Sequence, residues 1–335
     1  MNTARATLAD LAAFDEIIDV RSPAEFAEDH IPGAINCPVL DNEQRIQVGT
    51  LYKQVSPFEA KKIGAALIAE NIGRHLRERF LEKPKEWKPL ICCWRGGNRS
   101  GSMTTIFRAI GWKACQLEGG YKTYRSHVIA ELEKLPAQFE FKVICGPTGS
   151  AKTRVLQAIG KRGEQILDLE GLASHKGSVL GVLPGEPQPS QKWFETSLHL
   201  ALKSFDPARP VYVEAESRKI GNLHLPQALI DGIRAGECLT IAASLAARVD
   251  FLMVDYEYFL TLPELLIERL NVLQGLQSGE TLARWHEWVK AGAWQPLVEQ
   301  LLALHYDPLY QRSQNHNFTG LNAPQVFGAD TLTPD

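Results

Sequence analysis

Residues 142–153 read KVICGPTGSAKT, and this stretch indicates the fold of the second half of the chain. Lys142–Cys145 is a short apolar run typical of a buried strand in a parallel sheet, and a helical pattern follows Thr153. Gly146–Thr153 therefore lies between a strand and a helix, which is the context that a Walker A phosphate-binding loop requires. Ala151 replaces the usual second glycine, but it keeps the backbone amide and adds only a methyl group.

The loop predicts a site for a diphosphate. Lys152 would neutralise the phosphate charge, and Thr153 could hold Mg²⁺. The phosphate would be wrapped by the loop residues Gly146, Thr148, Gly149, Ser150 and Ala151. Such a loop recognises a diphosphate wherever it is attached, so the sequence does not decide whether ATP binds. The alternative is a glycine-rich turn between strand and helix that binds nothing.

Carboxylates follow a second predicted strand, Pro210–Glu214. In doubly wound sheets such a strand end lies beside the phosphate loop. Glu214, with Glu216 close behind, could hold Mg²⁺ through water or act as a base. Arg218 and Lys219 come next and could contact a polyanionic substrate, or they could be solvated loop charges.

Residues 93–99, CWRGGNR, form a second loop that could carry a reactive group. They follow the apolar run Pro89–Cys93, precede a helical pattern and have the spacing C-x5-R. Glycines let the amides face inward, and a helix N-terminus with nearby arginines favours a thiolate. The pattern predicts an anion cradle around a nucleophile, made by Cys93, Arg95, Gly96, Gly97, Asn98 and Arg99. The alternative is a core cysteine at a strand end, the role we predict for Cys92.

The order of patterns predicts two α/β domains. Glu16–Val20 is a further predicted strand, and residues 59–80 are a predicted helix. A polar stretch around Pro136 is the predicted linker. We therefore place one domain at residues 1–135 and another, with a parallel sheet and a helical C-terminal extension, at residues 136–335.

Composition narrows the function classes. No stretch of eighteen apolar residues occurs, so no membrane helix is predicted, and the N-terminal residues lack a signal-peptide core, so we expect a cytoplasmic protein. The six cysteines form no C-x2-C pair and are predicted to be free thiols. A net charge of −3 gives no global nucleic-acid footprint. Contact with RNA would therefore need a local basic cluster. One candidate cluster consists of Arg74, Arg77, Arg79, Lys83, Lys85 and Lys88. The same residues could equally form a solvated helix face.

The first domain resembles rhodanese domains. DVRSPAEF at residues 19–26 and HIPGAIN at residues 30–36 resemble the N-terminal signature of that family, and LEGGY at residues 117–121 resembles its closing motif. The resemblance implies that Cys93 carries sulfur or selenium as a persulfide or perselenide. Asp19 and Arg21 are expected to brace the fold as a buried pair. The C-x5-R spacing is one residue longer than the commonest rhodanese pattern and is shared by rhodanese-like phosphatases, so a phosphatase also stays open.

The whole chain resembles the tRNA 2-selenouridine synthase family, in which a rhodanese domain precedes a phosphate-loop domain and a helical tail. The resemblance is carried by CWRGGNRS at 93–100, LEGLASHKGS at 169–178, EAESRKIGN at 214–222 and HYDPLY at 305–310. It implies a transferase that replaces the sulfur of 2-thiouridine at the tRNA wobble position with selenium.

The same resemblance indicates which co-substrates the reaction uses. It implies selenophosphate as the selenium donor and geranyl diphosphate for an S-geranyl intermediate, with Mg²⁺ possible and no tightly bound cofactor. A geranyl chain requires an apolar pocket near the phosphate loop, whose residues the sequence does not identify. The oligomeric state is also left open.

Three other functions remain compatible with the motifs. The first is a sulfurtransferase that uses thiosulfate or a protein persulfide and carries a regulatory NTP-binding domain. The second is a phosphatase–kinase fusion. The third is a non-catalytic tRNA-binding module, against which the presence of two reactive loops argues.

Overall fold

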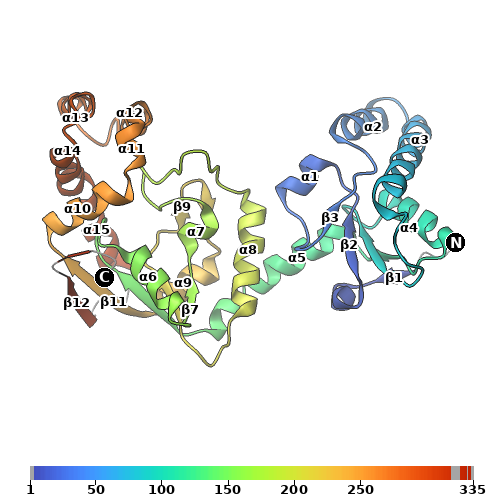
Figure 1. Ribbon diagram of the computed structural model, residues 1–335, viewed down its shortest axis with the longest axis horizontal. Helices are drawn as coiled ribbons and strands as arrows, with labels where there is room; N and C mark the ends of the chain where they lie inside the picture. The colour runs from blue at the N-terminus through green and yellow to red at the C-terminus, as the bar shows by residue number, and fades with distance from the viewer. Residues whose placement is uncertain (1–3, 318–324, 330, 333–335) are drawn as a thin grey trace. The chain divides into compact units, whose positions relative to one another are not determined.

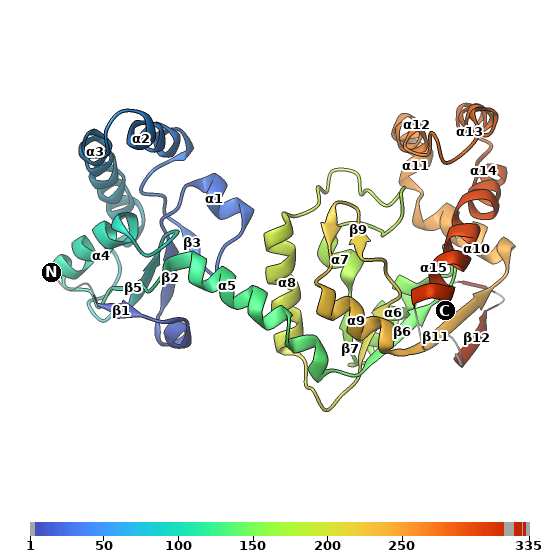
Figure 2. The ribbon, with the colours of Figure 1, turned by 180° about the vertical axis from the view of Figure 1, so that it is seen from behind.

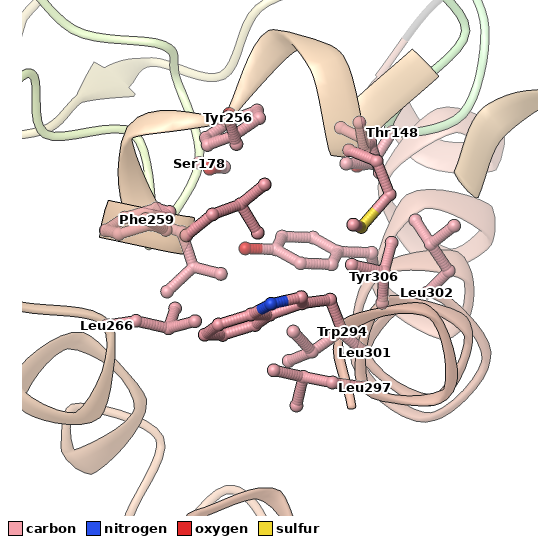
Figure 3. A pocket seen from close by; sticks show the side chains of 15 residues that line it. Thr148, Ser178, Tyr256, Phe259, Leu266, Trp294, Leu297, Leu301, Leu302 and Tyr306 are labelled. Carbon is pink, nitrogen blue, oxygen red and sulfur yellow. The ribbon is translucent and has the colours of Figure 1, made fainter. Parts of the chain in front are cut away.

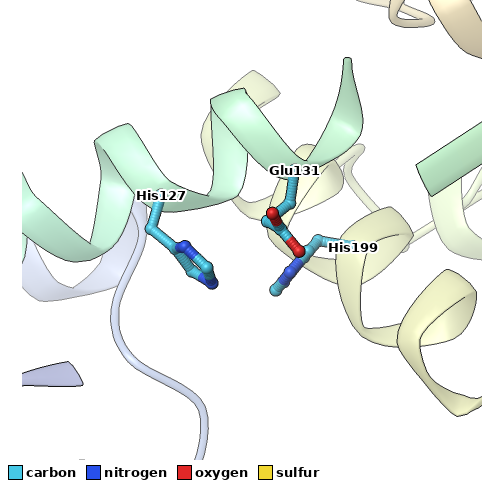
Figure 4. A group of neighbouring side chains, drawn as sticks. All are labelled: His127, Glu131 and His199. Atoms are coloured by element: carbon cyan, nitrogen blue, oxygen red, sulfur yellow. The ribbon is translucent and has the colours of Figure 1, made fainter. Parts of the chain in front are cut away.

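The computed structural model describes residues 4–317, 325–329 and 331–332, and it divides into two compact units (Figure 1). The units are Met1–Ala130 and Glu131–Asp335. The division lies inside helix α5 (Gly120–Leu132). The last two residues of α5 thus belong to the second unit, where Glu131 lies close to His199 of helix α8 (Gln191–Ser204), as Figure 4 shows.

The first unit is built on a five-stranded parallel sheet with the order β1-β5-β4-β2-β3. The strands are β1 (Arg5–Ala6), β2 (Glu16–Asp19), β3 (Ile35–Asn36), β4 (Pro89–Cys92) and β5 (Cys115–Leu117). The two strands predicted in this half are confirmed, each to within one residue. All four residues of β4 are buried, which explains its unbroken apolar sequence.

Helices cover both faces of this sheet. In both views α2, α3 and α4 lie on one side and α1 and α5 on the other (Figures 1 and 2). The helices and helical turns are η1 (Leu8–Ala13), α1 (Pro23–Glu28), α2 (Asn42–Gln54), α3 (Pro57–His75), the π-helical η2 (Leu76–Phe80) and α4 (Asn98–Ile110). The core between α3, α4 and the sheet includes Ile18, Ile72, Ile91, Met103 and Phe107.

Asp19 and Arg21 form the predicted buried pair. Their side chains are 0% and 1% exposed, and Arg21 Nη2 lies 2.6 Å from Asp19 Oδ2. The same nitrogen donates to the carbonyl of Asp29, and the guanidinium lies over the ring of Tyr121, whose hydroxyl donates to Asp29. This arginine therefore joins the start of the unit to its closing motif and is confirmed as a brace of the fold.

A second parallel sheet, with the order β12-β11-β6-β8-β7, organises the second unit. Its strands are β6 (Phe141–Cys145), β7 (Gln165–Leu167), β8 (Val211–Glu214), β11 (Glu237–Ala243) and β12 (Gln325–Ala329). Successive strands are added on both sides of β6, so the sheet is doubly wound as predicted. The strands β7 and β8 lie on one side of β6, and β11 and β12 lie on the other, so the order of winding switches beside β6. Ligands bind such sheets at the carboxyl ends of the strands at this switch point.

Most of the second unit outside its sheet is helical. Serine side chains cap several helix starts, including Ser190 before α8, Ser244 before α10 and Ser278 before α13. The remaining elements are η3 (Leu135–Gln138), α6 (Lys152–Lys161), α7 (Leu169–Ala173), the antiparallel pair β9 (Lys219–Ile220) and β10 (Leu223–His224), α9 (Gln227–Ala235), α10 (Leu245–Asp255), α11 (Tyr258–Thr261), α12 (Pro263–Asn271), α13 (Gly279–Ala291), α14 (Trp294–Leu301), the π-helical η4 (Leu302–Tyr306) and α15 (Asp307–Asn317).

The helical tail predicted at residues 262–304 is present as α12, α13, α14 and most of η4. These helices have their own apolar core, which includes Phe259, Leu270, Trp285, Val289 and Leu297. None of the helices in the described residues is long and apolar enough to cross a membrane.

Candidate active sites

The phosphate loop joins β6 to α6, as its sequence predicts. Gly146 and Gly149 have φ angles of +152° and +82°. A Cβ on Gly146 would lie 2.5 Å from Ser150 Oγ, and one on Gly149 would lie 2.8 Å from the Leu252 side chain. Both positions therefore need glycine for backbone conformation and for space.

Ala151 has a left-handed backbone conformation, with φ +59° and ψ +26°. An L-residue other than glycine loses about 1 kcal/mol or somewhat more in this conformation, because Cβ approaches the carbonyl oxygen. The conformation explains why glycine is usual at this position. Alanine is nevertheless accommodated, and it is the residue immediately before α6.

Lys152 and Thr153 begin helix α6 and face the loop. Lys152 Nζ donates to the carbonyls of Gly146 (3.0 Å) and Pro147 (3.4 Å). Thr153 Oγ1 donates to Glu170 Oε2 at 3.2 Å. The Lys152 ammonium is thus held over the loop, where it can neutralise an anion that the loop amides bind.

Three carboxylates gather beside this lysine. Ligand atoms of Glu170, Glu214 and Glu216 all lie within 4.8 Å of one another. Burial raises the pKa of each carboxyl, and the neighbouring acids raise the pKa of Glu170 and Glu214 further, against the lowering effect of Lys152. Glu214 is 3% exposed, and its Oε1 has no hydrogen-bond partner among the described residues. A group of buried oxygens of this kind favours a cation.

The back of the phosphate loop is anchored by an arginine of α10. Arg248 Nε donates to the carbonyl of Thr148 at 2.9 Å, and the same guanidinium binds both oxygens of Asp307 at 2.6 and 3.1 Å. Arg248 is 5% exposed. Asp307 belongs to the HYDPLY stretch, so that stretch fixes the loop through Arg248.

A large pocket of about 600 Å³ lies over the loop and the carboxylates. We call it the polar pocket, because most of the residues that line it are polar or charged. A smaller pocket of about 70 Å³ lies beside it and is almost entirely apolar. Figure 3 shows its aromatic and leucine side chains, from α11, α12, α14 and η4. Five residues line both pockets, namely Thr148, Ser178, Leu252, Tyr256 and Tyr306. The structure therefore places an apolar cavity directly beside a phosphate-type loop.

Of the charged residues predicted near this site, the structure brings only some together. Glu214 and Glu216 line the polar pocket, whereas Arg218 and Lys219 are exposed and are not among its lining residues. Lys176 lines the pocket instead, bonded to the carboxylate of Asp255 at 2.6 Å.

The cysteine loop of the first unit follows β4. Cys93 is 3% exposed, and its Sγ accepts from the amide of Gly97 at 3.3 Å and from Ser100 Oγ at 3.0 Å. Gly97 immediately precedes α4, so the sulfur lies at the N-terminus of a thirteen-residue helix. Two donors and the helix dipole favour a thiolate at this position.

The closing motif packs directly on this loop. A Cβ on Gly96 would lie 2.7 Å from the carbonyl oxygen of Leu117, and one on Gly120 would lie 2.2 Å from that of Cys93. The amide of Tyr121 donates to the Cys93 carbonyl at 2.8 Å. The glycines of the two motifs thus permit a close backbone approach that fixes the loop.

The other cradle residues have different surroundings. Arg99 forms two hydrogen bonds with Glu25, at 2.6 and 3.2 Å, and is thereby tied to the N-terminal signature. Arg95 and Asn98 are exposed on the loop. Arg95 is therefore the cation better placed to meet an incoming anion, whereas Arg99 has an ion-pair partner within the protein.

Glu170 and the aromatic residues that line the apolar pocket were not predicted as site residues from the sequence. Glu170 lies in the LEGLASHKGS stretch, which was identified only by resemblance. Its position in the sequence was the signal that could have identified Glu170, because it is a carboxylate three residues after the short apolar strand β7, which ends at Leu167. In the sheet, β7 lies two strands from β6.

Comparisons with known proteins match both units. A family model described as the tRNA 2-selenouridine synthase AAA domain matches residues 139–279, and a rhodanese-like domain model matches residues 3–127. These matches confirm the predicted order of a rhodanese-like domain followed by a phosphate-loop domain.

Curated proteins named tRNA 2-selenouridine synthase are similar to most of the chain. The one from Shewanella halifaxensis is 32% identical over 88% of this chain and 87% of its own length. Those from Alcanivorax borkumensis and Nitrosomonas europaea are 40% and 36% identical over 72% of this chain. The chain spans 66% and 63% of those two relatives, which is less than two thirds of each.

Proposed function

Because the chain belongs to the tRNA 2-selenouridine synthase family, we propose that it is a transferase that exchanges sulfur for selenium in wobble 2-thiouridine of tRNA. Selenophosphate supplies the selenium, and geranyl diphosphate supplies an activating alkyl group. The proposed place of action is the cytoplasm.

The shared lining of the polar and apolar pockets is the observation that carries this proposal. A prenyl diphosphate has a charged head and an apolar chain, and the second unit offers a matching pair of cavities that share five lining residues. ATP would need a site for its base and ribose. The apolar pocket, in contrast, is lined largely by leucines and aromatic side chains.

The first step is an alkyl transfer. The thiocarbonyl sulfur of the base attacks C1 of geranyl diphosphate, a C–S bond forms, and the C–O bond to diphosphate breaks with its electron pair on the leaving group. Loop amides and Lys152 stabilise the charge that develops on that diphosphate. In the second step a selenium nucleophile attacks C2 of the base and geranylthiol departs.

The residues around the loop fit Mg²⁺. Thr153, Glu170, Glu214 and Glu216 provide the oxygen ligands that this ion prefers, and the unpaired Oε1 of buried Glu214 points to a missing partner. When bound, the ion would supply positive charge for a diphosphate. Thr153 and the three carboxylates would hold it, while Lys152 contacts the diphosphate directly.

The first unit is assigned to selenium delivery. The Cys93 sulfur, with its two hydrogen-bond donors, would act on selenophosphate, whose phosphate the loop amides and Arg95 would bind. Its role is to receive selenophosphate and to assist cleavage of the P–Se bond. The selenium leaves with the bonding electron pair as selenide, and the phosphoryl group is transferred to water.

A mass measurement tests the proposal. The protein is incubated with an anticodon stem-loop that contains 2-thiouridine, geranyl diphosphate and Mg²⁺. We expect the mass of one geranyl group to be added, and chelation of Mg²⁺ to slow the reaction. No mass gain with folded protein would contradict the alkyl transfer and would favour the sulfurtransferase alternative, for which thiosulfate and ATP are the substrates to test.

The apolar pocket gives a sharper prediction. Met253 lines only the apolar pocket, and Met253→Trp is expected to raise KM for geranyl diphosphate about tenfold or more, because the larger ring fills the cavity. Val254, the next residue of α10, is 71% exposed and makes Val254→Trp a matched control. Inhibition by inorganic diphosphate should be unchanged in both variants. An unchanged KM for Met253→Trp would place the prenyl chain elsewhere.

A further inference from the structure

A chain of hydrogen bonds runs from β5 to the sulfur of Cys93. Gln116 Nε2 donates to Ser100 Oγ at 2.8 Å, and Ser100 Oγ lies 3.0 Å from Cys93 Sγ. The same Gln116 nitrogen donates to the carbonyl of Gly97 at 2.9 Å. Gln116, Ser100 and Cys93 are 4%, 0% and 3% exposed, so water does not compete freely for these bonds.

The geometry fixes the direction of each bond. The carbonyl of Gly97 can only accept, so the Gln116 side-chain atom 2.9 Å from it must be the amide nitrogen rather than the oxygen. That nitrogen has two hydrogens, one for Gly97 and one for Ser100. Ser100 Oγ therefore accepts from Gln116 and keeps a single hydrogen of its own to donate.

Two acceptors lie within reach of that hydrogen. The carbonyl of Gly97 is 3.3 Å from Ser100 Oγ and already accepts from Gln116, whereas Cys93 Sγ is 3.0 Å away. The Ser100 hydroxyl is thus directed at the sulfur. Together with the amide of Gly97 it gives the sulfur two donors, which stabilises a negative charge there.

We propose that Gln116 is a positioning residue for Cys93, which holds the Ser100 hydroxyl as a donor to the sulfur and so favours its thiolate. Gln116 does not touch the sulfur itself in these bonds; it acts through Ser100, while its bond to the Gly97 carbonyl holds the amide in place. This role goes beyond the proposed reaction, because it concerns the charge on the sulfur whatever group the sulfur later transfers. A buried amide is costly without partners, and here both of its hydrogens are used.

The test is the pH dependence of Cys93 alkylation by iodoacetamide in the full chain, read by peptide mass spectrometry. In Gln116→Met, which keeps the size but loses both donors, the pH of half-maximal rate should rise by about one unit. Ser100→Ala should raise it by at least as much. The double variant should show no further rise, because Gln116 acts through Ser100.

Other cysteines report whether the fold is intact. Cys92 is 0% exposed at the end of β4 and should stay unmodified, while Cys115 serves as a partly exposed reference. If Gln116→Met made Cys92 reactive, Gln116→Leu would provide the same comparison. The proposal would be overturned if the variant had the same pH profile as the protein without substitutions while Cys92 stayed protected. Fully additive shifts in the double variant would also overturn it. Because no tRNA or selenium is used, failure of the proposed function leaves this result unaffected.

Discussion

Lys152→Ala is expected to lower the rate of geranyl transfer to 2-thiouridine by at least about 100-fold, because a diphosphate leaving group loses its main positive partner. The Lys152 ammonium already lies 3.0 Å from the Gly146 carbonyl, over the loop that would hold the phosphates. The loss should appear mainly in kcat, since charge on the diphosphate increases as its bond to C1 breaks. Single-turnover mass spectrometry of the stem-loop measures it.

Lys161 provides a matched control at the other end of the same helix. It is exposed in the last turn of α6, so Lys161→Ala changes charge by the same amount far from the loop. Its rate should remain within about twofold of the unmodified protein. Near-normal geranyl transfer by Lys152→Ala would mean that the diphosphate does not bind in this loop.

Much of both sites was predictable because each consists of one continuous stretch. A strand, a glycine-containing turn and a helix start are local features, so KVICGPTGSAKT and CWRGGNR predicted β6, α6, β4 and α4 with their loops. The buried pair of Asp19 and Arg21 was also predictable, because the two residues are two positions apart at the end of a strand.

Features that join distant segments were not predictable in the same way. The carboxylate cluster combines Glu170 with Glu214 and Glu216, more than forty residues later, and only the order of strands in the sheet brings them together. The pairing of Arg99 with Glu25 likewise joins residues 74 positions apart. The C-x5-R spacing predicts this arginine as an anion ligand but does not show that Glu25 is its partner within the protein.

The apolar pocket shows the same limit more clearly. Its lining comes from the phosphate loop, from the loop after α7, and from α10, α11, α12, α14, η4 and the residue that follows α10. Each helix has an apolar face that is typical of ordinary core packing, and nothing in a single helix distinguishes a pocket wall from a core. Only packing of the tail against the phosphate-loop unit leaves a cavity there.

The second large effect is expected at Cys93. Cys93→Ala should abolish selenium incorporation, to below about 1% of the normal rate, while geranyl transfer continues. Alanine removes the sulfur but leaves the loop amides and the neighbouring glycines in place, so the fold should be little disturbed. The assay supplies a stem-loop that already contains S-geranyl-2-thiouridine together with selenophosphate, and follows the mass of the 2-selenouridine product.

Cys92→Ala is the control for this experiment, because Cys92 is the adjacent residue at the end of β4 and is fully buried. It removes one thiol from the core and should keep selenium transfer, with a loss of stability of about 1 kcal/mol.

The results for Lys152→Ala and Cys93→Ala together separate the two reactions. Lys152→Ala should still convert the S-geranyl stem-loop, and Cys93→Ala should still make it, so a mixture of the two variants should complete a conversion of 2-thiouridine that neither completes alone. Selenium incorporation by Cys93→Ala at the normal rate would remove the cysteine from the mechanism and leave the delivery of selenium to other groups.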